Sequence, residues 1–317
     1  MPRIPFSGES YPSKSKYANA ERTINWFPET DQHSKGQVVM YPTPGLVLKA
    51  TVGIGPIRAL LKFSNAAGDD KLFVVSGSEF YEVALGFGTV TLRGNLTTSA
   101  GPVSITHNGK NAPGQEVQLA DGTNGYNYNI STTTFITSVS VMANYPDAAT
   151  HVSFFDGFFL VNDPDATSGQ SGAFMWSSSY DGSTWAALDF STAERNPDDL
   201  LAIKTINKII YLMGEETTEL WYNSGTETNP FKPQTTIGVG IKAPHSAQVW
   251  NDRLVWLGTN KYGHARVYVA AGAQQKEVST ASLEQEWNSF SDLTDATAFI
   301  YEQDGHTFYE LTFPTGN

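Results

Sequence analysis

The sequence predicts an all-β fold of about six similar four-stranded units that follow an extended N-terminal arm. The clearest unit is Leu201–Asn223, in which three short β-branched or aromatic segments are separated by the turn pair Asn207–Lys208 and by a turn at Gly214. Similar hairpins are predicted at the turn pairs Asp156–Gly157, Asn251–Asp252 and Asp304–Gly305, and two degenerate copies at Leu60–Val83 and Val103–Ile130.

The spacing of these units indicates a circular arrangement. Consecutive second strands are 44, 41, 51, 45 and 54 residues apart when the units are indexed at Phe73, Val117, Phe158, Ile209, Leu254 and Phe308. This period is close to that of propeller repeats with four strands per blade. Helical repeats do not fit, because the apolar residues do not recur at helical spacing. Since one meander cannot bury both faces, each unit needs a neighbour on either side, and the sequence predicts a β-propeller.

Composition agrees with a turn-rich β protein. The 317 residues are 40% hydrophobic and only 16% charged. There is no cysteine, which excludes disulfides and thiolate chemistry. The N-terminus lacks an apolar segment of signal-peptide length, and no run is long enough to cross a membrane, so no membrane partner is expected.

The net charge of −12 is unevenly distributed. Residues 1–50 carry six Lys and Arg against four Asp and Glu, which leaves −14 for residues 51–317. An acidic body disfavours broad nucleic-acid binding, because phosphate contacts need clustered Lys and Arg. The charge is equally compatible with a simple role in solubility or with repulsion of DNA that passes nearby.

Residues 1–50 do not resemble a blade and are predicted to form an extended arm, with residues 51–317 as the propeller. Six prolines interrupt the arm, and two strands, Gln37–Tyr41 and Leu46–Thr51, are expected around the turn Pro42–Gly45. An N-terminal strand of this kind could close the propeller ring.

The arm contains a dense apolar cluster in Arg22–Glu29 (RTINWFPE). It could pack against its own propeller or on a neighbouring subunit, and aromatics in a proline-stiffened arm favour the second role. The predicted subunit-interface residues are Arg22, Asn25, Trp26, Phe27, Glu29, Pro42 and Pro44.

One short motif resembles the Asp box of sialidase-type propellers. In SYDGSTW, at Ser179–Trp185, the structural turn is assigned to Ser179, Asp181, Gly182 and Trp185, although the motif is one residue shorter than usual. The motif is structural even in enzymes. A sialidase would also need clustered arginines and a Tyr nucleophile with a Glu partner, and the seven arginines show no clustering in the sequence.

No other pattern predicts a catalytic, cofactor or metal site. The six histidines occur singly, and the glycine-rich segments Gly53–Arg58 and Gly238–Lys242 match no phosphate-binding motif. Asn162–Asp165 (NDPD) is a weak candidate cation loop without the ligand ladder of an EF-hand. One short helix is expected around Ser282–Phe290, with Ser282 and Gln285 at capping-box spacing.

Six segments, in order along the chain, resemble the packaged-DNA stabilisation proteins of short-tailed bacteriophages. They are Ser7–Glu29 with Tyr41–Leu46, then Asp121–Ile130, Asp189–Asp199, Trp256–Gly263, Glu277–Glu284 and Asp304–Thr315. In one respect the chain departs from the pattern: the resemblance implies further β structure after Pro314, whereas this chain stops at Asn317, inside the last blade. Either it is a fragment, which we expect, or the N-terminal strands fill the gap.

The resemblance implies a structural, non-enzymatic protein of the virion tail that needs no cofactor and is assembled in the host cytoplasm. Its copies would form a homo-oligomeric ring, a hexamer, beneath the portal or its adaptor ring. The ring would carry the tail needle and tailspikes and retain packaged DNA without binding it sequence-specifically. Two alternatives remain open: a sialidase-like carbohydrate-acting enzyme and a monomeric propeller binding module.

Overall fold

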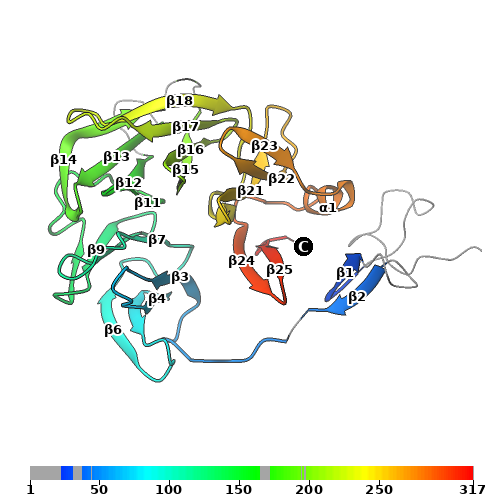
Figure 1. The fold of residues 1–317 in the computed structure, drawn as a ribbon, viewed down its shortest axis with the longest axis horizontal. Helices are drawn as coiled ribbons and strands as arrows, with labels where there is room; N and C mark the ends of the chain where they lie inside the picture. The colour runs from blue at the N-terminus through cyan, green and yellow to red at the C-terminus, as the bar shows by residue number, and fades with distance from the viewer. Residues whose placement is uncertain are drawn as a thin grey trace, which may run out of the picture.

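A computed structural model describes residues 23–30, 38–43, 45–164, 172–193, 195 and 198–316. Figure 1 shows antiparallel sheets arranged around a centre, with one short helix, α1 (Ala281–Trp287), at the rim. The predicted all-β propeller is confirmed. Among the described residues no helix is long and apolar enough to cross a membrane.

The first three blades are regular four-stranded meanders in which neighbouring strands pair in antiparallel register. They consist of β3 (Ile57–Phe63), β4 (Lys71–Ser76), β5 (Glu79–Val83) and β6 (Val90–Asn95) in blade 1; β7 (Ser104–His107), β8 (Glu116–Ala120), β9 (Gly125–Asn129) and β10 (Thr134–Thr137) in blade 2; and β11 (Val152–Phe155), β12 (Phe158–Asp163), β13 (Ala173–Ser178) and β14 (Asp181–Thr192) in blade 3.

Blade 4 is also a four-stranded meander, and the two sheets after it are less regular. They consist of β15 (Leu200–Ile206), β16 (Ile209–Gly214), β17 (Thr218–Asn223) and β18 (Phe231–Ile237) in blade 4; β19 (Gly240–Ile241), β20 (Gln248–Trp250), β21 (Arg253–Thr259), β22 (Arg266–Ala271) and β23 (Gln274–Glu277) in blade 5; and β24 (Thr297–Gln303) with β25 (His306–Thr312) in the last sheet. In blade 5 both β19 and β20 pair with β21, and the 3₁₀ turn η1 (Pro244–Ser246) lies between them in the chain.

The predicted repeat positions are correct. Phe73, Val117, Phe158, Ile209 and Phe308 lie on the second strand of their sheets, and Leu254 lies on β21, which follows the split first position of blade 5. The predicted turn pairs Asp156–Gly157, Asn207–Lys208, Asn251–Asp252 and Asp304–Gly305 all have positive φ at their first residue, which two-residue hairpins of this handedness require.

The core is divided into five hydrophobic clusters, each between two consecutive sheets. The cluster between blades 1 and 2, for example, joins Phe73 and Phe80 to Tyr128, whose ring meets both at right-angled contacts of 5.8 and 5.5 Å. Similar clusters join each later pair, the last one including α1 and β25. None of the clusters found in the described part of the chain joins the last sheet to blade 1.

The arm differs from the prediction. The predicted strand Gln37–Tyr41 is confirmed as β2 (Val38–Pro42), but its partner is β1 (Trp26–Thr30), which was not predicted, and the predicted strand Leu46–Thr51 is not formed. Pro28 obscured β1 in the sequence; it is tolerated because a two-stranded hairpin has only edges. Figure 1 shows the segment after β2 running past β24 and β25 to reach β3.

The helix prediction is correct in position but not in its cap. Thr280 is the N-cap residue, and its side chain makes no capping hydrogen bond; Ser282 lies inside the helix. Instead, Ser279 Oγ donates to Glu284 Oε1 at 2.7 Å. Leu283 and Trp287 face the cluster shared with β25, as their four-residue spacing predicts.

Candidate interaction surface

The hairpin β1–β2 is anchored to the last sheet by one of its two faces. Phe27 lies 5.1 Å, between ring centroids, from both His306 and Phe308 of β25. On the same face Glu29 Oε2 lies 3.8 Å from His306 Nε2, and the Phe27 ring stacks on Tyr41 at 5.8 Å. Because alternate residues of a strand point to opposite sides, Phe27 and Glu29 share the face that meets β25.

The other face of the hairpin is open to solvent. Trp26 is 51% exposed and pairs across the hairpin with Pro42, which is also exposed. Asn25, in the left-handed conformation, closes this end through its carbonyl, which accepts hydrogen bonds from the Thr43 backbone N–H at 2.9 Å and hydroxyl at 3.2 Å. The predicted interface residues Arg22 and Pro44 lie outside the described residues. The apolar cluster therefore divides: Phe27 packs on its own propeller and Trp26 faces outward.

Residues 45–52, here called the crossing segment, connect the hairpin to blade 1. Leu46, Val47 and Leu48 are 102%, 74% and 81% exposed. Within the described residues, no backbone hydrogen bond joins this segment to the propeller. The crossing segment therefore presents both apolar side chains and unpaired peptide groups to its surroundings.

Where the chain enters blade 1, the backbones of two segments touch. A Cβ on Gly55 would lie 2.5 Å from Gly77 Cα, so no larger residue fits there. The Gly77 N–H donates to the Pro56 carbonyl at 2.9 Å, and Ser76 Oγ donates to the Gly55 carbonyl at 3.0 Å. The glycine-rich segment Gly53–Arg58 is thus a connector.

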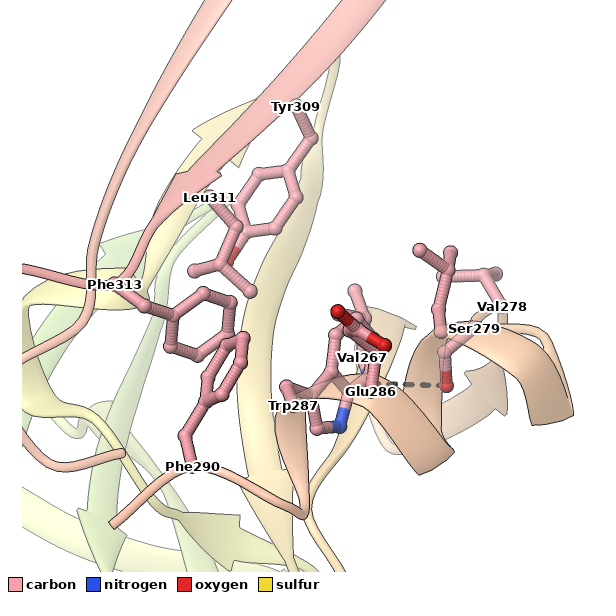
Figure 2. A pocket seen from close by; sticks show the side chains of 10 residues that line it. Val267, Val278, Ser279, Glu286, Trp287, Phe290, Tyr309, Leu311 and Phe313 are labelled. Carbon is pink, nitrogen blue, oxygen red and sulfur yellow. Dashed lines mark hydrogen bonds between the residues drawn. The ribbon is translucent and has the colours of Figure 1, made fainter. Parts of the chain in front are cut away.

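A groove of about 380 Å³ lies between α1 and β25 (Figure 2). Its apolar lining includes Trp287, Phe290, Leu311 and Phe313, and the rings of Phe290 and Phe313 meet at 5.2 Å. Trp287 is fixed by a 2.8 Å hydrogen bond from Nε1 to the Ala265 carbonyl. The groove therefore lies beside a strand that, among the described residues, pairs with β24 alone.

The Asp-box-like turn lies at the interface of blades 2 and 3. Ser179 occupies the turn before β14, and Asp181 Oδ1 accepts a 2.9 Å hydrogen bond from the Ser183 N–H. Trp185 Nε1 donates to the Gly182 carbonyl at 2.9 Å, and its ring meets Tyr145 at 4.9 Å. The turn thus holds a buried tryptophan in the cluster between the two blades.

The same turn makes a second contact with blade 2. Gly182 N–H donates to Glu116 Oε2 at 2.8 Å, and a Cβ on Gly182 would collide with Asn127 and Gln118. Burial raises the pKa of Glu116, although these hydrogen bonds oppose the shift. These contacts give the turn a structural role, because its polar groups are used within the propeller.

Arg58 is a structural residue that the sequence did not identify. Its guanidinium donates five hydrogen bonds, to the carbonyls of Gly77, Thr98, Ala100 and Gly101 and to the Thr98 hydroxyl, at 2.6–2.9 Å. All five donors of the side chain are therefore used. Arg58 closes the connection between blades 1 and 2 rather than facing a ligand.

The candidate cation loop is only partly described. Asn162 Oδ1 accepts hydrogen bonds from the backbone N–H groups of Thr150 and His151 at 3.0 and 2.8 Å, whereas Asp165 lies outside the described residues. Across the described ranges, no group of three or more His, Asp or Glu side chains is placed to hold a metal ion.

Comparison with known families places the protein. The family described as "Bacteriophage P22 Gp10, beta-propeller" matches residues 2–316. The chain belongs to this family. It is therefore a phage structural protein with a β-propeller fold, and the family extends over the arm as well as the blades.

Two further comparisons add no functional information to the family. No curated protein matches the chain. A solved structure of PorZ, a bacterial surface component of the type-IX secretion system of Porphyromonas gingivalis, is similar with a TM-score of 0.49 and 10% identity. The match covers 82% of this chain and 33% of PorZ, so the chain spans about a third of that protein's length.

Proposed function

We propose that copies of this chain form the tail hub of a short-tailed phage, a homo-oligomeric ring on the tail axis. The ring closes the portal channel, retains packaged DNA, and attaches the tail needle and the tailspikes. It is assembled in the host cytoplasm and remains in the virion tail. The family supports the structural role, and the exposed crossing segment supports the assembly into a ring.

The crossing segment is the observation that carries the proposal. Leu46, Val47 and Leu48 would be costly to leave in water in a stable monomer, since each apolar side chain of this size is worth about 1.5–3 kcal/mol when buried. An extended segment with unpaired peptide groups can add to the open edge of a sheet on another subunit. The apolar groove between α1 and β25 is the surface that we assign to the arm of a neighbouring subunit. The ring is therefore held by an arm from one subunit on the last sheet of the next.

Trp26 extends this surface. It lies on the outward face of the hairpin, so a neighbouring subunit can cover it without displacing Phe27 from β25. Aromatic residues are enriched in interfaces, and docking a hairpin that is already formed loses less entropy than docking a free chain.

The charge of the body fits a channel through which DNA passes. Residues 51–317 carry a net charge of −14. Negative walls repel phosphates, so the ring retains the genome sterically and does not bind it during exit.

The proposed role contains no catalytic step. A sialidase-like site would need several arginines directed at one substrate carboxylate. Arg58 lines a cavity at the centre of the propeller, but all five of its N–H donors are already used by protein oxygens. A fluorogenic sialoside assay tests the alternative, and turnover above the background without protein would contradict the structural role.

Light scattering after size-exclusion chromatography tests assembly directly. We expect the full chain to run as a ring, and Trp26→Ala to shift it toward monomer with an unchanged circular dichroism spectrum. Tyr262→Ala is the matched control, because Tyr262 is an exposed aromatic in the turn between β21 and β22 of blade 5. A wild-type chain that stays monomeric, or equal effects of both substitutions, would contradict the proposed interface.

Imaging of phage tails tests the location. Electron microscopy of tails labelled on this chain should show density in a ring on the tail axis, at the junction with the head. Label on the capsid shell or on the distal spikes alone would contradict the tail-hub assignment.

A further inference from the structure

The innermost strands of the propeller enclose a cavity of about 380 Å³. Strands from blades 1, 2, 4 and 5 and from the last sheet line it: β3, β7, β15, β20 and β24, respectively. His245 of η1 also lines the cavity. The cavity therefore lies where the innermost strands of these sheets converge.

Part of the cavity lining consists of basic side chains, of which Lys204 carries the charge. Lys204 of β15 and His245 of η1 line the cavity, together with His151, which precedes β11. No Asp or Glu is part of the lining formed by the described residues. Arg58 also lies at the wall, but its five donors are used by the blade connection.

The Lys204 ammonium has no partner among the described residues: no hydrogen bond or ion pair of this group is present. Other cations in blades 1 and 5, such as Arg93 and Arg266, are paired with carboxylates at 2.8 and 2.7 Å. Burial lowers the pKa of Lys204 to about 8, so the side chain is still mostly protonated at pH 7. A half-buried cation without a counter-charge in an acidic protein is costly, and an anion would offset that cost.

The two histidines have different roles. His151 Nε2 donates to the Pro244 carbonyl at 3.2 Å and its Nδ1 accepts from the Thr150 hydroxyl at 3.0 Å, so this neutral ring is fixed. His245 stacks on it at 4.5 Å between centroids, and neither of its ring nitrogens has a hydrogen-bond partner in the described part of the chain. Burial, followed by the charge of Lys204, lowers the pKa of His245 to about 4. His245 is therefore a neutral ring that can donate one N–H into the cavity.

Another part of the lining is apolar. Ile57 and Leu60 of β3 and Phe299 of β24 line the cavity, and each is about half exposed. Exposed apolar side chains in a cavity favour a ligand that has an apolar body.

We propose that the central cavity binds a small organic carboxylate. Its carboxylate accepts hydrogen bonds from Lys204 Nζ and from the His245 N–H, and its apolar body packs on Ile57, Leu60 and Phe299. This inference depends on the cavity of a single chain and holds whether or not the chain forms a ring.

Calorimetric titration of the full chain with benzoate tests the proposal. We expect binding, and at least about a tenfold loss of affinity in Lys204→Gln, since a hydrogen bond to a charged group is removed. Lys276→Gln is the matched control, because it makes the same change on the exposed outer strand β23 and should bind as the wild type does. No binding by the wild type, or equal affinity in Lys204→Gln, would overturn the site.

Inorganic phosphate is the second ligand to titrate, because it has an anionic head and no apolar body. Weaker binding than benzoate supports a role for the apolar part of the lining, and equal or tighter binding overturns it. If Lys204→Gln does not fold, carbon-13 NMR of the reductively methylated wild type replaces it. Benzoate should then raise the pKa of one lysine that titrates near 8, and an unchanged titration would overturn the proposal.

Discussion

The two sides of the propeller differ in how neighbouring sheets cover their strands. Blades 2 to 4 each have four strands and are packed between two neighbours by shared hydrophobic clusters. On the opposite side, β24 and β25 form a two-stranded sheet that, among the described residues, shares a hydrophobic cluster with blade 5 alone, and the arm crosses the other side with exposed apolar residues. Burial between sheets therefore stabilises this fold, and the exposed apolar residues of the arm are the natural place for a partner.

Two tryptophans express the same contrast. Trp256 of β21 is fully buried, stacks on Tyr268 at 5.8 Å and donates from Nε1 to the Gly240 carbonyl at 3.0 Å. Trp26 of the arm is half exposed and has its partner Pro42 across the hairpin. The first tryptophan should determine stability and the second assembly.

Trp256→Ala should have the largest effect. Removing a large buried side chain between blades 4 and 5 leaves a cavity and an unpaired carbonyl, so we expect a loss of about 3–5 kcal/mol in the free energy of unfolding. Urea unfolding followed by tryptophan fluorescence measures it. A loss below about 1 kcal/mol would show that the interblade cluster does not stabilise the closed side.

Arg58→Met should have an intermediate effect. It leaves the carbonyls of Thr98, Ala100 and Gly101 without their donor, which costs about 1–3 kcal/mol. The exposed Arg253 provides the control, since Arg253→Met should change stability by less than about 0.5 kcal/mol. Equal urea midpoints for the two variants would refute a structural role for Arg58.

Acidification should lower the stability of the fold through His151 and His245 at the centre of the propeller. Burial lowers the pKa values of His151 and His245 in the folded state, so the unfolded chain takes up more protons below its pKa of about 6.5. Stability from these groups is complete above about pH 6.5 and is lost as the pH falls toward 4. The other titratable groups of the cavity, Lys204 and Arg58, stay charged over this range.

The size of this effect can be isolated by substitution. For His245 we expect a loss on the order of 1 kcal/mol between pH 7.5 and pH 5, which His245→Gln should remove. The exposed His264 is the control, because His264→Gln should keep the wild-type slope. Identical slopes of stability against pH in the wild type and His245→Gln would contradict the buried neutral state of this ring.

Trp26→Ala should have the smallest effect on folding. The Trp26 side chain contributes little to its own propeller. The free energy of unfolding of the monomer, measured in urea, should therefore change by less than about 0.5 kcal/mol. Phe27→Ala is the contrasting variant, because it removes the ring that anchors the hairpin to Phe308 and should release the hairpin from β25. A larger loss of stability in Trp26→Ala than in Phe27→Ala would reverse the assignment of the two faces.

The blades were predictable because their signals are local. Positive φ at Asp156, Asn207, Asn251 and Asp304 matches the turn pairs that the sequence shows directly. Strand β1 was not predicted because it contains Pro28, and a proline usually argues against a strand. Residues 45–50 were predicted as a strand, but the structure gives them no strand partner.

The sites were harder to predict because they depend on distant residues. Arg58 donates to a carbonyl 40 positions along the chain. Lys204 lies close enough to His245 to lower its pKa only because the blades of one propeller are arranged in a circle. A useful signal for Lys204 was available: a lysine in the middle of the apolar strand LLAIKTI, where a charge needs an explanation.

Hydrogen–deuterium exchange of the assembled chain against dilute monomer tests the central claim most directly. If the arm of one subunit packs on the last sheet of the next, the amides of residues 45–52 and of β25 should exchange more slowly in the assembly than in the monomer. The amides of blades 2 to 4 should exchange equally fast in both. Protection confined to the outer strands of blades 2 to 4, with the crossing segment exchanging as fast as in the monomer, would contradict it.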